Sequence, residues 1–185
     1  MKIVAVSQRV DTELKLNETR DALDQNINSF LLACGLTPVP VPNVLIDEVI
    51  RTGLNCNLTK FINKIEPYGI ILSGGNNIGK ERLRDQTETW MLDYAEKKCL
   101  PVLGICRGTQ MMAHRSGGCL KSITGHCKSR HRIHGEISGT VNSYHDFSLL
   151  ECPENFKVIA WSDDNAIEAI QHVAFPWKGW MWHPE

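Results

Sequence analysis

Short apolar runs of strand length alternate with stretches of helical pattern from the first residues to Arg115. The runs KIVAV, YGIIL and PVLGI are nearly continuous in apolar residues, as expected for strands buried on both faces. Such alternation is typical of a parallel sheet covered by helices. We therefore predict an α/β fold with a mostly parallel central sheet, helices on both faces and a few antiparallel edge strands.

The pattern places each element approximately. Strands are predicted at Lys2–Val6, Thr37–Val41, Tyr68–Leu72, Pro101–Ile105, Gly139–Val141, Lys157–Trp161, Ala166–Gln171 and Trp180–Trp182, several of them antiparallel and near an edge. Helices are predicted at Thr19–Cys34, ending at Gly35, at Asp47–Thr52 as a weak helix, at Asp85–Lys98 and from Thr109 to Arg115. Gly117–His134 is predicted to be a loop with short strands. Residues 1–185 suffice for a single domain with its own core.

Composition excludes some classes of function. A formal net charge of −1 gives no overall field to attract nucleic acid or an anionic membrane. There is no run of about 18 apolar residues to span a membrane, and the start does not resemble a signal peptide. The cysteine count is odd, at seven, and the spacing is irregular. We expect reduced thiols, mostly buried as small core residues, in a cytoplasmic protein.

One cysteine stands in a different setting. Cys106 follows the strand PVLGI, precedes a helix and has glycines two residues away on either side, Gly104 and Gly108. This is the G-x-nucleophile-x-G elbow with cysteine in place of serine. The turn lifts the thiol out of the sheet and places it at a helix N-terminus, which favours the thiolate. The alternative is a buried cysteine in an ordinary strand–helix turn, as would also fit Cys34 or Cys99.

An oxyanion formed at this thiol would need hydrogen-bond donors. The backbone N–H of Arg107 lies in the elbow itself. A second donor is expected from the glycine loop after the preceding strand, at Gly75. Donors of this kind contribute about 3–4 kcal/mol each to transition-state stabilisation.

The end of the sequence offers a base. His183 follows the apolar segment WMW and precedes Pro184 and Glu185. One imidazole nitrogen can face a thiol while the carboxylate holds the other, and the proline stiffens the link. An isolated histidine at a strand end is commonly structural, but an elbow elsewhere in the chain favours the catalytic interpretation.

The motifs GICRGTQ, LSGGNN and WHPE resemble, in this order, those of class I glutamine amidotransferases. Further details resemble the γ-glutamyl hydrolase branch, typified by γ-glutamyl-γ-aminobutyrate hydrolase. They are SQR after the first strand, Arg84-Asp85 with Glu88, Gly117-Gly118, Val141 to His145, and Ser162-Asp163-Asp164 before Glu168-Ala169. Relatives usually continue into a last helix, whereas this sequence ends at Glu185.

The resemblance implies a flavodoxin-like fold and a Cys106–His183–Glu185 triad, with no cofactor. It also implies that Gln110 helps to hold a glutamyl group, that the segment Asn142-Ser143-Tyr144-His145 lines the same pocket, and that Ser143 and Tyr144 hold the glutamyl end largely through backbone groups. Simpler interpretations remain for two of these residues, because Gln110 could cap the elbow helix and His145 could be a core histidine.

Two activities fit this chemistry. The first is hydrolysis of a γ-glutamyl amide through a γ-glutamyl thioester on Cys106, releasing glutamate. The second is that of a glutaminase subunit supplying ammonia from glutamine to a synthetase partner. The details of the γ-glutamyl hydrolase branch favour the first, with a small-molecule γ-glutamyl conjugate as substrate and neither nucleic acid nor membrane as partner. A binding module without turnover is a third, less favoured alternative.

Basic residues gather between Lys121 and Arg132 in this nearly neutral chain. Arg130 and Arg132, with Arg9 after the first strand, could bind an anionic leaving group, because arginine pairs well with phosphate. Some short members of the resembled branch hydrolyse a γ-glutamyl nucleotide amidate, which would suit such a loop. The alternative is a solvated basic loop.

The same region suggests a metal site. The residues that invite a zinc interpretation are Cys119, His126, Cys127, His131 and His134. Their spacing lacks the paired arrangement of common structural zinc sites. We therefore predict no metal site from the sequence.

Overall fold

The computed structural model describes residues 1–46 and 57–185, so the weak helix predicted at Asp47–Thr52 lies outside the described residues. The strands are β1 Lys2–Ser7, β2 Arg9–Glu13, β3 Glu18–Ala22, β4 Leu36–Val41, β5 Gly69–Leu72, β6 Val102–Ile105, β7 Leu120–Ser122, β8 Cys127–Gly135, β9 Gly139–Tyr144, β10 Phe147–Leu149, β11 Phe156–Ser162, β12 Ile167–His172 and β13 Trp177–Trp180. The helices are α1 Gln25–Ala33, the 3-10 helix η1 Asn43–Ile46, α3 Asn57–Ile65, α4 Arg82–Lys98 and α5 Arg107–Arg115.

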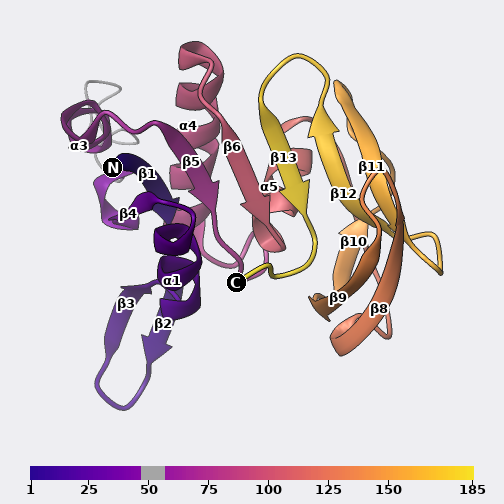
Figure 1. Cartoon of the computed structure of the whole chain (residues 1–185). Helices are drawn as coiled ribbons and strands as arrows, with labels where there is room; N and C mark the ends of the chain where they lie inside the picture. The colour runs from indigo at the N-terminus through magenta and orange to yellow at the C-terminus, as the bar shows by residue number, and fades with distance from the viewer. Residues whose placement is uncertain (47–56) are drawn as a thin grey trace.

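Nine strands of the described part form one sheet in the order β4-β1-β5-β6-β13-β12-β11-β8-β9 (Figure 1). From β4 to β13 neighbouring strands are parallel. From β13 to β9 they are antiparallel. The predicted α/β class is confirmed, with an antiparallel extension of four strands on one side.

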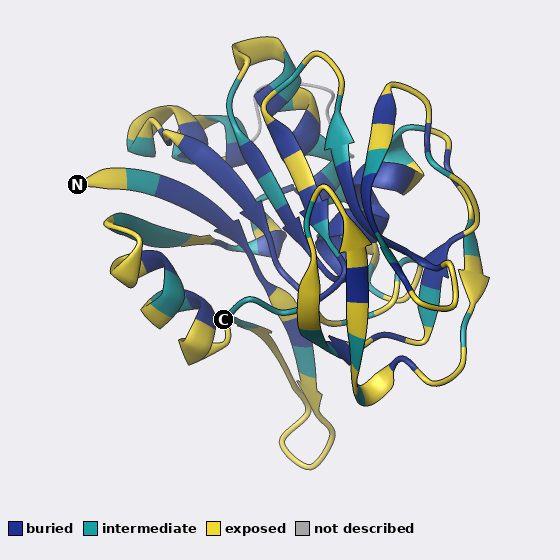
Figure 2. Ribbon diagram, turned by 45° about the vertical axis from the view of Figure 1, so that its right-hand side comes forward, coloured by how far each residue is buried: buried dark blue, intermediate teal, exposed yellow. Residues whose placement is uncertain are grey.

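Helices cover the parallel part on both faces. Helix α1 packs against one face, where Ile27 and Leu31 meet Val4 and Val6. The other face carries α3, α4 and α5, whose buried side chains include Leu58, Met91 and Met112. The central strands are buried along most of their length (Figure 2), which explains their nearly continuous apolar sequence.

Strands β5, β6 and β13 point the same way, so their carboxyl ends meet at one edge of the sheet. Figure 1 shows this edge at the bottom, with the C-terminus beside the arrowheads of β5 and β6. The hairpin of β2 and β3 projects from the same edge. In open α/β sheets, ligands bind outside the carboxyl ends of the strands.

The predicted helix Thr19–Cys34 is wrong in its first part. Glu18–Ala22 pairs with β2 as a strand instead, and the helix begins at Gln25. The carboxylate of Asp24 accepts a hydrogen bond from the N–H of Asn26 at 2.8 Å, which caps the helix at that point. Its predicted end is confirmed, because Gly35 follows the helix with φ +73°, a conformation that glycine adopts readily.

Other boundaries also differ. The segment predicted as a loop with short strands contains β8, a nine-residue strand that pairs with β9 and β11. The last strand is Trp177–Trp180, not Trp180–Trp182. Helix α3 and strands β2 and β10 were not predicted. Pairing with other strands decides the two strands, which are only five and three residues long. Helix α3 does carry an amphipathic pattern, with Leu58 and Ile62 buried, that the sequence analysis did not use.

The expectation that most cysteines are buried is wrong. Four of the described cysteines are exposed and Cys152 is partly exposed, whereas Cys106 is buried. Cys34 and Cys99 end helices α1 and α4, at the surface. The cysteine in the elbow is therefore set apart by its burial.

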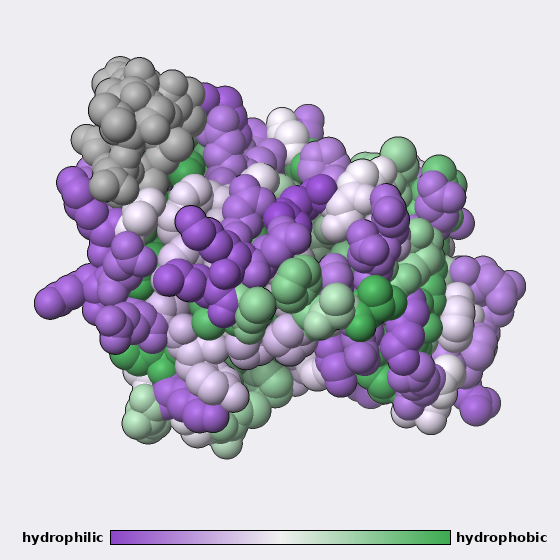
Figure 3. All heavy atoms as spheres, turned by 90° about the horizontal axis from the view of Figure 1, so that it is seen from above, coloured by the Kyte–Doolittle hydropathy of each residue, from purple (hydrophilic) through white to green (hydrophobic). Residues whose placement is uncertain are grey.

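The surface is predominantly hydrophilic on the edge opposite the carboxyl ends of the parallel strands, and its hydrophobic residues lie in several separate groups (Figure 3). In the part of the chain that the structure describes, no helix combines the length and apolar character needed to cross a membrane.

Candidate active site

The elbow forms because glycines let β6 and α5 approach the neighbouring backbone. A Cβ at Gly108 would lie 2.2 Å from the carbonyl oxygen of Leu72. A Cβ at Gly104 would lie 2.7 Å from the backbone nitrogen of Thr109. Cys106 itself has φ 50° and ψ −105°, a strained conformation for a residue with a side chain. The surrounding packing therefore holds the cysteine in this turn.

Cys106 is fixed between β6, β13 and α5. Its N–H donates to the carbonyl of Trp180 at 2.7 Å, and its carbonyl accepts from Thr109 and Gln110. The hydroxyl of Thr109 also donates to Trp180, at 2.9 Å. The side chain stands at the N-terminus of α5 and the residue is 6% exposed. The helix N-terminus is the setting that favours a thiolate at this position.

His183 reaches this cysteine from the segment after β13. Its Nδ1 lies 2.8 Å from Oε1 of Glu185. Burial by itself would lower the pKa of His183, but hydrogen bonds to the side chains of Cys106 and Glu185, with their charges, raise it to about 10. The imidazole therefore carries a proton over most of the physiological range.

The backbone of His183 is held by a side chain from the segment predicted to line the pocket. Asn142, on β9, accepts from the His183 N–H at 2.9 Å and donates to its carbonyl at 2.8 Å. The ring of Tyr144 meets the imidazole edge-on, with ring centroids 5.8 Å apart. On the other side lies Gly74, where a Cβ would approach Cε1 of His183 to 2.7 Å. The imidazole thus fits a space that requires glycine.

The glycine loop after β5 rests on a buried cluster of charges. Arg84 donates to the carbonyl oxygens of Ser73 and Gly74, each at 2.8 Å. Gly75 has φ +121°, and a Cβ there would collide with Arg84 and Arg9. Gly75, the expected oxyanion donor, therefore belongs to a loop whose backbone is held in place by hydrogen bonds from Arg84.

The same cluster includes the side chain of Arg107. It pairs with Glu88 and Asp85, while Arg84 contacts Glu88 at 3.0 Å. Arg84 and Glu88 are fully buried. Burial, partly opposed by Asp85, lowers the pKa of Arg84 to about 10. Burial and the neighbouring Arg84 lower that of Arg107 to about 9. Both guanidinium groups stay charged at neutral pH, so Glu88 is their shared counter-ion.

A small cavity of about 70 Å³ adjoins these groups. It is lined in part by Arg9, Gly74, Gly75, His183 and Glu185. The side chain of Arg9 is half exposed and contacts Asp11 at 2.8 Å. The structure therefore brings Arg9 and Gly75, both predicted site residues, to the histidine.

The residues expected to hold substrate lie in different settings. Gln110 is buried and donates to the carbonyl of Phe147 at 3.0 Å, and Ser143 donates to the carbonyl of His126. Tyr144 is exposed beside His183. The ring of His145 points away, toward Glu168, with 3.6 Å between Nε2 and Oε1. A role for His145 in substrate binding would therefore fall to its backbone.

Basic side chains flank the site on the antiparallel side. Arg130 lies opposite Asn142 in the β8–β9 pairing, and paired residues project their side chains from the same face of a sheet. A surface depression is lined by Lys128, Ser129, Arg130, Asn142 and Tyr144. Arg132 is two residues farther along β8, on the same face as Arg130.

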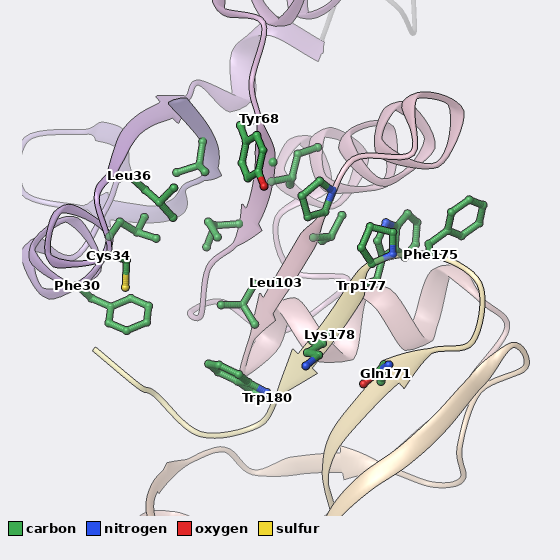
Figure 4. A pocket seen from close by; sticks show the side chains of 18 residues that line it. Phe30, Cys34, Leu36, Tyr68, Leu103, Gln171, Phe175, Trp177, Lys178 and Trp180 are labelled. Carbon is green, nitrogen blue, oxygen red and sulfur yellow. The ribbon is translucent and has the colours of Figure 1, made fainter. Parts of the chain in front are cut away.

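A second, apolar depression lies on the sheet face beside α1 (Figure 4). Its volume is about 470 Å³, and Phe30, Tyr68, Leu103 and Trp180 contribute to its lining. Cys106, His183 and Glu185 are not among its lining residues. We therefore locate the candidate active site at the carboxyl edge of the strands.

Sequence reasoning did not assign site roles to Gly74 and the Arg84–Glu88 pair, and it placed Asn142 in the pocket wall without its contact to His183. The glycine pair in LSGGNN and the neighbouring charges Arg84 and Asp85 were visible signals. The contacts that these residues make with distant parts of the chain were not visible in the sequence.

The chain is similar in sequence to proteins of known families. Residues 18–185 match the family model of glutamine amidotransferase class-I. The chain belongs to this family. It is 30% identical over 122 residues to the γ-glutamyl-CDP-amidate hydrolase of Campylobacter jejuni, covering 63% of this chain and 61% of that protein. It is 31% identical over 134 residues to anthranilate synthase component 2 of Thermococcus kodakarensis, covering 67% and 68%.

Parts of synthetases are also among the relatives. A glutamine-hydrolysing GMP synthase subunit of Methanosarcina barkeri is 34% identical over 130 residues, covering 65% of each chain. The matches span less than two thirds of the first curated relatives, 61% and 64% for two of them. A glutamine amidotransferase structure from Thermotoga maritima superposes on 98% of this chain and 75% of its own, with a TM-score of 0.70 and 15% identity. This likeness supports the predicted flavodoxin-like fold.

Proposed function

We propose that this chain is a hydrolase that cleaves the γ-glutamyl amide bond of a small conjugate with an anionic leaving group. The observation that supports the proposal is the setting of His183, whose Nδ1 lies 2.8 Å from Oε1 of Glu185 and whose pKa is raised by interactions with the side chains of Cys106 and Glu185. Residues 1–185 would form the single domain that does this.

In the first step the Cys106 thiolate attacks the γ-carbonyl carbon. A carbon–sulfur bond forms, and the carbonyl π electrons move to the oxygen. The backbone N–H groups of Arg107 and Gly75 would stabilise this oxyanion. The tetrahedral intermediate then breaks its carbon–nitrogen bond, and the protonated His183 gives its proton to the departing amine. A γ-glutamyl thioester remains on Cys106.

In the second step water attacks the thioester carbonyl. The imidazole of His183, neutral after the first step, takes a proton from this water. The carbon–sulfur bond breaks, glutamate leaves and the thiolate–imidazolium pair is restored. Glu185 keeps the imidazole in one orientation through both steps. Gln110, Ser143 and Tyr144 would hold the glutamyl group, with the backbone of His145.

The preference for an anionic leaving group rests on charge. Lys128 and Arg130 line the depression next to Tyr144 and Asn142, beside the histidine that would protonate the leaving amine. Arg9 approaches from the opposite side. The relative from Campylobacter jejuni is named for a nucleotide amidate, which makes a phosphorylated leaving group a reasonable first substrate class.

The central test compares the parent with Cys106→Ala on neutral, cationic and phosphorylated γ-glutamyl amides. We expect glutamate release by the parent, fastest with a phosphorylated amide, and none above background by the variant with an unchanged circular dichroism spectrum. Near-parental hydrolysis by the variant would contradict the proposed nucleophile.

The leaving-group assignment has a separate test. Arg130→Ala and Arg132→Ala should lower kcat/KM for a phosphorylated amide about tenfold, because each removes a cation near the phosphate, while hydrolysis of a neutral amide stays unchanged. Lys157→Ala is a matched control, since this exposed lysine on β11 pairs with Glu136, between β8 and β9. Equal losses on neutral and phosphorylated amides would argue against the assignment.

A second candidate is a glutaminase subunit that supplies ammonia to a synthetase partner. The likeness to the GMP synthase of Methanosarcina barkeri and to anthranilate synthase component 2 favours it. Glutaminase activity of the isolated chain, measured against hydrolysis of γ-glutamyl amides, separates the two. Turnover of glutamine that appears only with an added synthetase would support this second candidate.

A further inference from the structure

Three histidines and a glutamate converge in the antiparallel half of the sheet, away from the Cys106 thiol. Glu168, on β12, is fully buried, and His126 and His145 are nearly so. His131, on β8, is 17% exposed in its side chain. Ligand atoms of His126, His131 and Glu168 all lie within 4.8 Å of one another.

The nitrogens gather around one carboxylate oxygen. Oε1 of Glu168 is 3.2 Å from Nδ1 of His126, 3.3 Å from Nε2 of His131 and 3.6 Å from Nε2 of His145. In a tetrahedral site with metal–ligand bonds of about 2.0 Å, ligand atoms are about 3.3 Å apart. The separations from Oε1 to His126 and His131 are close to the edge length of such a tetrahedron, whereas His145 contacts the carboxylate from farther away and is not part of the group within 4.8 Å.

The outer nitrogens of two of these rings have partners of their own. Nε2 of His126 lies 3.0 Å from a carboxylate oxygen of Asp164, and Nδ1 of His145 lies 3.0 Å from the carbonyl of Phe147. Metal-bound histidines almost always donate their outer N–H to a carboxylate or a backbone carbonyl. These contacts hold the two rings in orientations that turn their inner nitrogens toward Glu168.

The inner atoms lack hydrogen-bond partners. Both carboxylate oxygens of Glu168, Nδ1 of His126, Nε2 of His145 and both ring nitrogens of His131 are buried without one. Buried polar atoms are normally hydrogen-bonded, and an unpaired buried carboxylate is especially costly. One unpaired atom from each of His126, His131 and Glu168 lies within 4.8 Å of the others, and this grouping indicates a cation among them.

We propose that His126, His131 and Glu168 bind one divalent transition metal ion, with zinc as the preferred ion. Two imidazoles and one carboxylate are protein ligands that zinc accepts, with a fourth position open to a small ligand. Cys119, Cys127 and His134, which the sequence grouped with His126 and His131, are exposed and take no part. The fold supplies Glu168 instead, which comes from later in the chain.

The ion would have a structural role. It would join β12 to the β8–β9 hairpin, which carries Asn142 and therefore holds the backbone of His183. The N–H of Met181, two residues before His183, donates to the carbonyl of Glu168 at 2.8 Å. A metal in this cluster would thus stabilise both the wall of the site and the strand that leads to the histidine. This inference does not depend on the reaction proposed above.

The test measures metal directly. The intact chain is dialysed against a chelator, incubated with zinc, desalted and analysed by atomic spectrometry. We expect about one zinc per chain, a higher Tm with zinc than without, and a cobalt-substituted form with visible absorption but no thiolate-to-cobalt charge-transfer band. Failure of the intact chain to retain zinc, or a thiolate band in the cobalt form, would overturn the proposal.

Variants locate the ion. Glu168→Gln and His131→Gln should each reduce retained zinc at least tenfold. His134→Gln is the matched control, since His134 lies on the same strand and is exposed. It should retain zinc as the parent does. Equal retention by the parent and both ligand variants would place the ion elsewhere, and loss of zinc in the control alone would also contradict the site.

Discussion

Replacing Gly74 by alanine should displace the imidazole of His183 with little effect on the fold. The added Cβ would lie 2.7 Å from Cε1 of His183. Ordinary contacts of this kind begin near 3.4 Å, so the ring must retreat by roughly 0.7 Å. Because that atom is at the end of a side chain, the ring can turn away without moving the backbone.

The cost should therefore appear in catalysis. A misplacement of about 1 Å in a catalytic group can reduce the rate on the order of 100-fold. We expect Gly74→Ala to lower kcat/KM by about 50- to 100-fold, or roughly 2.5 kcal/mol of transition-state stabilisation. The free energy of unfolding should change by no more than about 0.5 kcal/mol, since the backbone of Gly74 is not in the left-handed region.

The assay is hydrolysis of a γ-glutamyl amide, together with the rate of Cys106 alkylation and urea denaturation. Gly35→Ala is the control, because Gly35 has φ +73° and open space around its Cβ position. It should lose about 1 kcal/mol of stability through backbone strain and keep its activity. Near-parental activity of Gly74→Ala, or a loss fully explained by unfolding, would refute the reasoning.

Three further predictions concern the surroundings of the histidine. Asn142→Ala removes two hydrogen bonds to the backbone of His183 and should cost about 2 kcal/mol of stability by urea denaturation, with a larger loss in kcat than in KM. The charged form of His183 contributes its full stabilisation of the fold below the unfolded pKa of 6.5, and this contribution is lost as pH rises through the folded pKa of about 10. The difference in unfolding free energy between the parent and His183→Gln should therefore shrink between these two pH values. Glu88→Ala leaves two buried arginines without their shared counter-ion and should cost about 3–5 kcal/mol, measured by the urea midpoint; a cost below about 1 kcal/mol would show that Asp85 alone suffices.

The local sequence pattern was enough to predict the buried parallel strands and the elbow. The runs containing Ile70 and Val102 are apolar throughout because both faces of each strand are covered, and that signal is independent of the rest of the chain. Gly104 and Gly108 are required by contacts within a few residues of Cys106 or with the adjacent strand. Polar, half-exposed elements such as β3 and β8 carried no comparable signal.

The sequence by itself determined which groups are candidates to react: a cysteine in a glycine-flanked turn and a histidine followed by a carboxylate. Each motif spans only a few residues, so covalent bonds keep its members close together whatever the rest of the fold. Only the tertiary structure decided what surrounds them. Gly74 against the imidazole, Asn142 on its backbone and Glu88 beneath the glycine loop are contacts between segments far apart in the chain. The meeting of His145 with Glu168 has the same origin. Sequence spacing does not encode such contacts, because strand order and register set the distances between atoms on different strands.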